Sequence, residues 1–148
     1  MRTFHGHKSS VKCVLFAPTN THLLSVGDDK CIKMWDVANS ECTLSIENAH
    51  DDFIRTAAFV GESGQQFITG GYDHQVHFWD LQKSLTLPQC SMDHGAPVDV
   101  VLVHKKGTIA VSAGTPFFSS TAAQPRVLIY AIKADPKSSY GTSPKTGR

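Results

Sequence analysis

Two sets of side chains in this sequence could hydrogen-bond to one another in series. In each set a hydroxyl residue, an aspartate and a tryptophan follow at intervals of four and six positions, and a histidine lies 18 or 19 positions before the hydroxyl. An imidazole, a hydroxyl, a carboxylate and an indole N–H each need a partner when buried, and together they can satisfy one another. The spacing predicts two such networks, formed by His7, Ser25, Asp29 and Trp35 and by His50, Thr69, Asp73 and Trp79.

A third set of the same kind is incomplete. His94 and Ser112 keep the spacing of the first network, but Tyr130 stands where a tryptophan is expected. The interval from Ser112 to Tyr130 is 18 positions rather than ten, because an insertion over 115–126 takes the place of the aspartate. We therefore expect a shorter network of His94, Ser112 and Tyr130.

The remaining polar residues show no pattern typical of catalysis or metal binding. His74 and His77 lie three positions apart in or beside an expected strand, where side chains alternate, so they should point to opposite faces and share no metal ion. The acidic pairs at 28–29 and 51–52 could suggest acid–base catalysis, but they fall in expected turns. We expect no catalytic residue, no metal site, no cofactor and no small-molecule substrate, and hence no enzyme.

Composition narrows the function further. The 148 residues carry 14 Lys and Arg against 13 Asp and Glu, a net charge of +1, and this near balance argues against a protein that mainly neutralises phosphates. The longest nearly apolar stretch, 97–103, is far shorter than the roughly 20 residues that span a bilayer, so no membrane partner is expected. The four cysteines form no Cys-x-x-Cys pair and are expected to be free thiols; they are Cys13, Cys31, Cys42 and Cys90.

The segments that must position these residues are short, rich in β-branched and aromatic residues, and bounded by turn residues. They predict an all-β chain with little helix. The expected strands are 11–16, 23–26, 31–35 and 42–46 in the first copy, 54–60, 66–69, 75–79 and 85–89 in the second, and 98–103, 109–112 and 127–130 in the third. Segment 132–148 lacks apolar periodicity and is expected to be a disordered basic tail.

The three copies repeat with a nearly constant period. His7, His50 and His94 are 43 and 44 positions apart, and the Trp-Asp pairs at 35–36 and 79–80 are 44 apart. A period of about 40–45 residues with a Gly-His opening and a Trp-Asp close resembles the WD40-repeat family of β-propellers. The resemblance implies WD40 repeats over 1–131, as an arc of about three four-stranded blades at 4–47, 48–91 and 92–131 from a ring of about seven. It also implies that the three networks are the structural hydrogen bonds of the blades.

Proteins of this family often bind partners through the face that carries the Gly-His loops. The candidates on that face are Asp28, Phe53, Tyr72, Phe117 and Phe118. Exposed aromatic side chains in a polar loop often anchor a partner, although each of these residues could instead pack against its own blade or serve only as a turn residue. Asp28 and the acidic pair at 51–52 make this face acidic, which disfavours direct contact with phosphate.

A narrower resemblance rests on three runs, FITGGYDH at 67–74, HGAPV at 94–98 and IAVSAG at 109–114. They are similar to consecutive blades of a nucleolar family of U3 small nucleolar RNA-associated WD-repeat proteins. This implies a non-enzymatic scaffold of the small-subunit processome, acting in pre-rRNA processing and in 18S rRNA and small ribosomal subunit biogenesis in the nucleus and nucleolus. The implied partners are other protein subunits of a ribonucleoprotein assembly, with U3 snoRNA and pre-rRNA contacted indirectly.

The alternative hypothesis is a generic WD40 protein-interaction scaffold in another complex. A substrate receptor of a ubiquitin ligase would be expected to show Trp-Asp-x-Arg at the close of a blade. Here the first Trp-Asp pair is followed by Val37-Ala38 and the second by Leu81-Gln82. The ligase function is therefore disfavoured.

Overall fold

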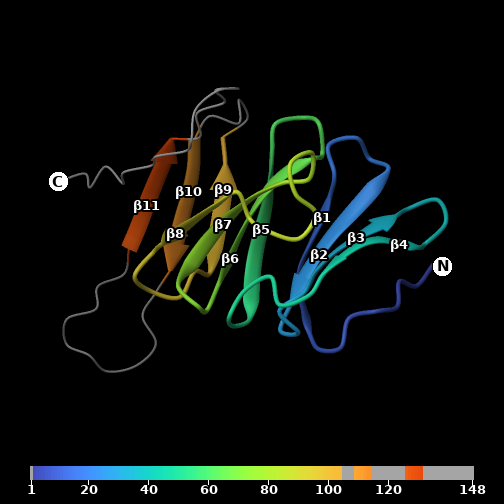
Figure 1. Cartoon of the computed structure of the whole chain (residues 1–148), viewed down its shortest axis with the longest axis horizontal. Helices are drawn as coiled ribbons and strands as arrows, with labels where there is room; N and C mark the ends of the chain where they lie inside the picture. The colour runs from blue at the N-terminus through green and yellow to red at the C-terminus, as the bar shows by residue number, and fades with distance from the viewer. Residues whose placement is uncertain (1, 105–108, 115–125, 132–148) are drawn as a thin grey trace.

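The computed structural model describes residues 2–104, 109–114 and 126–131, which form three antiparallel β-sheets (Figure 1). These described residues contain no helix, and so none that could cross a membrane. Within each sheet the strands pair in the order in which they follow along the chain. The predicted all-β, bladed architecture is thus confirmed. The expected tail at 132–148 lies outside the described residues.

The first sheet consists of four strands in chain order. They are β1 (Val11–Phe16), β2 (His22–Gly27), β3 (Ile32–Asp36) and β4 (Cys42–Ile46). The turn between β2 and β3 places Lys30 in the left-handed region, with φ 62°. Asp29 stabilises this turn, because its Oδ1 accepts a hydrogen bond from the Cys31 N–H at 3.2 Å.

The second sheet repeats this order with β5 (Ile54–Val60), β6 (Gln66–Gly71), β7 (Gln75–Asp80) and β8 (Cys90–Asp93). The strand expected at 85–89 was wrong, since those residues form the connection into β8. Pro88 has no N–H to donate to a ladder, and Leu85 is 56% exposed. The pairing of β8 puts Ser91 opposite His77, just as β4 puts Ser45 opposite Lys33.

The third sheet contains β9 (Val100–Val103), β10 (Ile109–Gly114) and β11 (Arg126–Ala131). Its register aligns Val100 with Ala113 and Ala113 with Val127. One face of this sheet is apolar and exposed, since Val100, Leu102, Val127 and Ile129 are 44 to 66% accessible.

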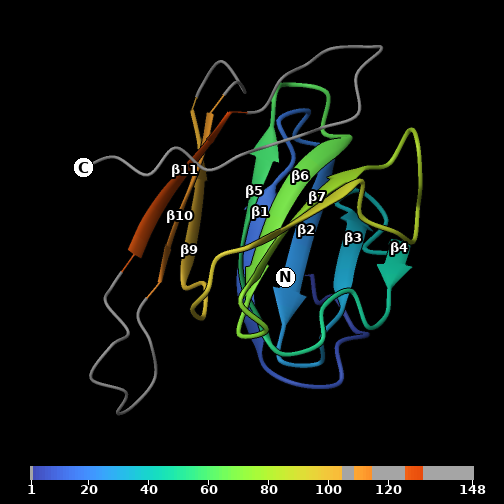
Figure 2. The same ribbon diagram turned by 60° about the vertical axis from the view of Figure 1, so that its left-hand side comes forward.

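The first strands of the three sheets lie next to one another. Figure 2 shows β5 between β1 and β9, and β5 contacts both of these strands. Both β1 and β5 carry a bulge near their start, where one residue has no direct partner across the ladder: Lys12 in β1 and Arg55 in β5. A bulge re-aims the side chain it carries, and here Lys12 contacts Asp28 and Arg55 contacts Tyr72.

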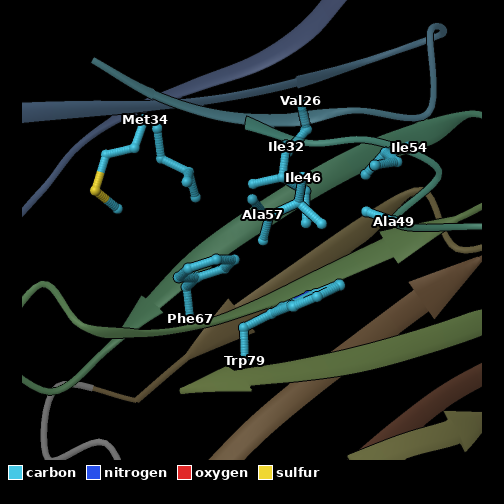
Figure 3. Close-up of a cluster of buried hydrophobic side chains, with 10 residues drawn as sticks. Val26, Ile32, Met34, Ile46, Ala49, Ile54, Ala57, Phe67 and Trp79 are labelled. Atoms are coloured by element: carbon cyan, nitrogen blue, oxygen red, sulfur yellow. The ribbon is translucent and has the colours of Figure 1, made fainter. Parts of the chain in front are cut away.

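The apolar core lies between neighbouring sheets. Figure 3 shows the cluster between the first and second sheets, which contains Val26, Ile32, Met34, Ile46, Ala49, Ile54, Ala57, Phe67 and Trp79. Ile32, Ile54 and Trp79 are fully buried, and burying each such side chain contributes about 1.5–3 kcal/mol. A second cluster, centred on Ile68, Val76 and Val98, joins the second and third sheets.

Candidate functional site

The first network lies within one sheet and joins four residues in series. His7 Nδ1–H donates to Asp29 Oδ2 at 2.7 Å, and His7 Nε2 lies 2.7 Å from Ser25 Oγ. Ser25 Oγ also accepts the indole N–H of Trp35 at 2.8 Å. The indole N–H can only donate and the carboxylate can only accept. These two ends of the series therefore fix which group donates in each hydrogen bond between them.

The second network repeats this geometry in the second sheet. His50 Nδ1–H donates to Asp73 Oδ2 at 2.8 Å, while His50 Nε2 lies 2.7 Å from Thr69 Oγ1. The indole N–H of Trp79 donates to Thr69 Oγ1 at 2.9 Å. His50, Thr69 and Trp79 are each no more than 2% exposed. At this depth each member of the network depends on the others for its hydrogen bonds.

The third network has three members, and its histidine uses the other ring nitrogen. A hydrogen bond of 2.8 Å joins His94 Nδ1, rather than Nε2, to Ser112 Oγ. Ser112 Oγ in turn donates to the Tyr130 hydroxyl at 3.3 Å. All three residues are buried, and burial raises the pKa of Tyr130. The phenol thus stands in the place of the indole.

The two aspartates are held in their charged form. Burial alone would raise the pKa of Asp29, but hydrogen bonds from the Lys8 N–H, from His7 and from the Cys31 N–H outweigh it and lower the pKa. Asp73 has the same balance: burial opposes, and hydrogen bonding from His50 lowers the pKa. Both carboxylates are engaged in these structural hydrogen bonds, so neither is available as a general base.

His77 lies beside the second network and was missed by the sequence analysis, which had compared it only with His74. Its ring centroid is 4.2 Å from that of His50, and a ligand atom of each of His50, Asp73 and His77 lies within 4.8 Å of the other two. Burial, followed by the nearby His50, lowers the pKa of His77 to about 4. His74 is instead exposed in the β6–β7 turn with φ 67°.

The same position in the first sheet holds a lysine. Lys33 lies four residues after Asp29, as His77 lies four residues after Asp73. Its Nζ donates to Ser45 Oγ at 2.6 Å. Only the copy-to-copy comparison of residues at this position could have drawn attention to His77 from the sequence.

Three of the expected partner-binding residues lie on the loop face that carries the β2–β3 and β6–β7 turns. Asp28 and Tyr72 occupy equivalent places, each directly before a network aspartate. Phe53 is 41% exposed, and its ring centroid is 6.4 Å from that of Tyr72. The Tyr72 N–H donates to the Phe53 carbonyl at 2.9 Å, which ties the two residues together. Phe117 and Phe118 lie outside the described residues.

The sequence analysis did not foresee the two cations on this face. Lys12 Nζ lies 2.9 Å from Asp28 Oδ2, and the guanidinium carbon of Arg55 lies 4.9 Å from the centre of the Tyr72 ring. Each comes from the bulge of its strand, so the same backbone device brings a cation over the residue before the network aspartate. We call Phe53, Arg55 and Tyr72 the aromatic cluster.

A groove of about 330 Å³ between β1, β5 and β9 contains no catalytic side chain. The side chains that line it are all apolar and come from Leu15, Phe16, Ala57, Ala58, Phe59, Val101, Leu102 and Val103. An active site normally combines an apolar pocket with a few convergent polar groups. This groove supplies only the former.

Comparisons with known proteins agree with this architecture. Residues 1–36 and 40–80 match the family described as WD40, WD domain, G-beta repeat. The U3 small nucleolar RNA-associated protein 15 homolog of Xenopus tropicalis is 34% identical over 114 residues, 77% of this chain and 22% of the relative. The Lissencephaly-1 homolog 1 of Paramecium tetraurelia is 46% identical over 82 residues, 53% of this chain and 19% of the relative. The chain thus spans about one fifth of the length of these curated relatives.

A solved structure shows the same fold. A chain in the crystal structure of the mitotic checkpoint complex superposes with a TM-score of 0.75 at 21% identity, covering 99% of this chain and 43% of that one. Repeated four-stranded sheets, two matching hydrogen-bonded networks and the family match all lead to one assignment. The chain belongs to the WD40 repeat family of β-propeller proteins.

Proposed function

We propose that this chain is a non-enzymatic scaffold of the nucleolar small-subunit processome, acting in pre-rRNA processing and in 18S rRNA and small ribosomal subunit biogenesis. The observation that carries the proposal is the length of the match to the U3 small nucleolar RNA-associated relative. At 114 residues it must extend into a third repeat of 43 or 44 positions. The Lissencephaly-1 match, at 82 residues, is shorter than two such repeats.

A scaffold role is supported by the use of the polar residues. The buried histidines, hydroxyls and aspartates of the first two copies hydrogen-bond to one another within their own sheets. The groove at the inner strands has an apolar lining. What remains on the loop face is a set of side chains suited to protein contact rather than to bond making or breaking.

The aromatic cluster is the surface proposed to contact a protein subunit. Tyrosine, phenylalanine and arginine are enriched at the centres of protein interfaces. Phe53 is 41% exposed, and the Arg55 guanidinium lies over the Tyr72 ring, so both an apolar and a cationic group are already placed on the surface. The acidic residues Asp51 and Asp52 lie directly before Phe53. They disfavour phosphate, and contact with U3 snoRNA and pre-rRNA is therefore proposed to be indirect.

The proposal is tested by expressing the tagged full chain in a eukaryotic cell. We expect a nucleolar signal and co-purification of processome proteins together with pre-rRNA. Treatment of the lysate with ribonuclease should remove the RNA and leave the protein partners bound, because the contact is with protein. A cytoplasmic signal, or capture of a different complex without pre-rRNA, would instead support a WD40 scaffold elsewhere.

The role of the aromatic cluster is tested with the double variant Phe53→Ser and Tyr72→Ser. Capture of processome proteins should fall at least about tenfold, the effect expected from losing an interface anchor of about 1.4 kcal/mol or more. Leu85→Ser is the matched control, because Leu85 is 56% exposed in the β7–β8 connection, at the other end of β7 from the β6–β7 turn. Equal losses in both proteins would remove this surface from the proposal.

A further inference from the structure

The second sheet has two apolar faces, and each is covered by a neighbouring sheet. Side chains alternate along a strand, so Ala57 of β5 packs in the core with the first sheet and Ala58 packs against the core with the third. In the same way Trp79 of β7 belongs to the core with the first sheet and Phe78 to the core with the third. Each core therefore joins one kind of face of the earlier sheet to the opposite kind of face of the later sheet.

Among the described residues, the first sheet keeps one apolar face exposed. This face carries Val14 and Phe16 of β1, which are 55% and 64% exposed. They stand 43 positions before Ala57 and Phe59, the residues of β5 that pack in or against the core with the first sheet. The free face of the first sheet is therefore the counterpart of the face by which the second sheet covers the first.

The N-terminal segment covers part of this face but leaves β1 open. Phe16 aligns with Leu23, and Leu23 aligns with Trp35, so the three side chains share the face. Phe4 packs edge-on against the Trp35 ring, with the ring centroids 5.7 Å apart, whereas Phe16 stays exposed. The open part of the free face of the first sheet therefore lies on β1.

The exposed apolar face of the third sheet is the opposite kind of face. Leu102 of β9 stands 44 positions after Ala58. Ile129 of β11 directly precedes the network residue of its strand, as Phe78 of β7 does. Ala58 and Phe78 are residues with which the second sheet covers the third. The free face of the third sheet thus repeats a face that, one sheet earlier, is buried by the sheet that follows.

We propose that these two free faces bind each other between two copies of the chain, with the third sheet of one copy packed on the first sheet of the other. Such a contact repeats the two cores that already join the sheets within one chain. Because β1 contacts β5 and β5 contacts β9, β9 of one copy would contact β1 of the second. A second copy is the partner because each chain carries both halves of this contact, and burial of their apolar side chains drives the association.

The size of the chain favours a closed dimer. Contacts between two unlike faces either close into a ring or continue as a filament. Two copies supply six sheets, three from each, and propellers close with four to eight blades. The chain covers 43% of the superposed chain from the mitotic checkpoint complex, so two copies amount to slightly less than one such chain. The dimer would contain two identical contacts, and it does not depend on the proposed nucleolar function, because it uses the faces of the sheets and not the aromatic cluster.

The experiment is sedimentation velocity of the full chain over a concentration series, for which we expect wild type to be a dimer. One variant carries Leu102→Glu and Ile129→Glu on the third sheet, and the other carries Val14→Lys and Phe16→Lys on the first. Either variant alone alters one side of both contacts in the ring. The concentration at which half of the chains are dissociated should therefore rise at least about tenfold for each, the effect of losing interface anchors.

The matched control carries Leu85→Glu and Leu87→Glu. Both leucines are exposed, at 56% and 67%, and both lie in the β7–β8 connection, outside the two free faces. This control introduces the same charges as the third-sheet variant and should dimerise as wild type does. A loss equal to that of the third-sheet variant would assign the effect to added charge and overturn the proposal.

Mixing the two variants tests whether unlike faces meet. In a mixed pair one contact has two unaltered faces and the other sets glutamates against lysines, so a heterodimer should form although neither variant associates alone. This rescue also requires both variants to be folded, which circular dichroism checks independently.

Four outcomes would overturn the proposal. If the first-sheet variant alone stayed dimeric, two third-sheet faces would be stacking on each other. A failure of the two folded variants to associate on mixing would exclude the head-to-tail contact. Species larger than a dimer that grow with concentration would show that the contacts do not close. A wild-type chain that remains monomeric would leave the free faces to another segment of the chain or to a different protein.

Discussion

The guanidinium carbon of Arg55 lies 4.9 Å from the centre of the Tyr72 ring. In the first sheet the equivalent bulge residue, Lys12, pairs with Asp28 at 2.9 Å. The two copies thus keep a cation at one backbone position and change the partner beneath it, from a carboxylate to a ring. Since the fold accommodates either a carboxylate or a ring beneath the cation, a substitution at this position can test partner binding with little change in stability.

The Tyr72→Asp variant converts the second sheet to the arrangement of the first. Arg55 gains a carboxylate partner and loses a ring, and a partly exposed pair of either kind contributes about 1 kcal/mol or less. The free energy of unfolding measured in urea should therefore change by less than about 1 kcal/mol. Capture of the protein partner should still fall, and a variant that binds normally would show that the ring is not part of the interface.

Thr69→Val should be among the most damaging substitutions of similar volume. The hydroxyl is the shared partner of His50 and Trp79, and each buried group left unpaired costs about 1–3 kcal/mol. We expect a loss of about 2–4 kcal/mol in urea unfolding. Thr86→Val, at an exposed position in the β7–β8 connection, should stay within about 0.5 kcal/mol; similar losses for both would mean that the network does not stabilise the fold.

Stability should fall on mild acidification because of His77. The pKa of this imidazole is about 4 in the folded chain against 6.5 for the ordinary group. Between these values the unfolded chain binds the proton and the folded chain does not, so the free energy of unfolding decreases as the pH falls from 6.5 to about 4 and then levels off for this group. Urea unfolding of the full chain should show a shallower decline with falling pH in His77→Gln, and parallel curves would contradict the attribution of this decline to His77.

Gly70 of β6 lies directly against Val98, in the segment that leads into β9. A Cβ atom there would lie 2.5 Å from Val98 Cγ1 and 3.1 Å from Thr56 Cγ2, so Gly70→Ala should destabilise the chain by about 1–3 kcal/mol through overpacking. Val98→Ala removes the clashing methyl group. The two losses should be less than additive in a double-mutant cycle, whereas full additivity would place the cause elsewhere.

The exposed face of the third sheet should make the chain associate. Leu102 and Ile129 are 62% and 54% exposed, and both stand opposite position 111 of β10. Contiguous apolar surface of this kind favours self-association. The double variant Leu102→Glu and Ile129→Glu should sediment closer to a monomer than wild type does over a concentration series. An unchanged distribution would show that association uses another surface.

The fold could be predicted from the sequence to the extent that it depends on local pattern. Strands such as 11–16 and 54–60 are rich in β-branched and aromatic residues and lie between turn residues, and the structure has them at the predicted bounds. The prediction failed at 85–89, where Leu85 and Leu87 flank the β-branched Thr86 but extend into solvent. The strand begins only after Pro88 because its register is set by pairing with β7, which a local pattern does not report.

The candidate site, too, could be predicted from the sequence only in part. The hydrogen bonds of His7 and of Trp35 to Ser25 join residues whose regular spacing had suggested contact. His77 and Arg55 were missed for two different reasons. The proximity of His77 to His50 depends on how the segment before β5 folds over β7, and Arg55 reaches Tyr72 only because a bulge turns its side chain.

The pairing of every strand with its neighbour in the chain has a consequence for biosynthesis. In the first sheet β4 ends at Ile46, and among the described residues no hydrogen-bonded ladder of that sheet uses a residue beyond it. The His7–Asp29 and His50–Asp73 hydrogen bonds likewise span only 22 and 23 positions. Such local contacts form quickly, and chains fold from the N-terminus as they are made. The strands of each blade can therefore pair as they leave the ribosome, and their apolar side chains become buried when the following blade is made and packs against them.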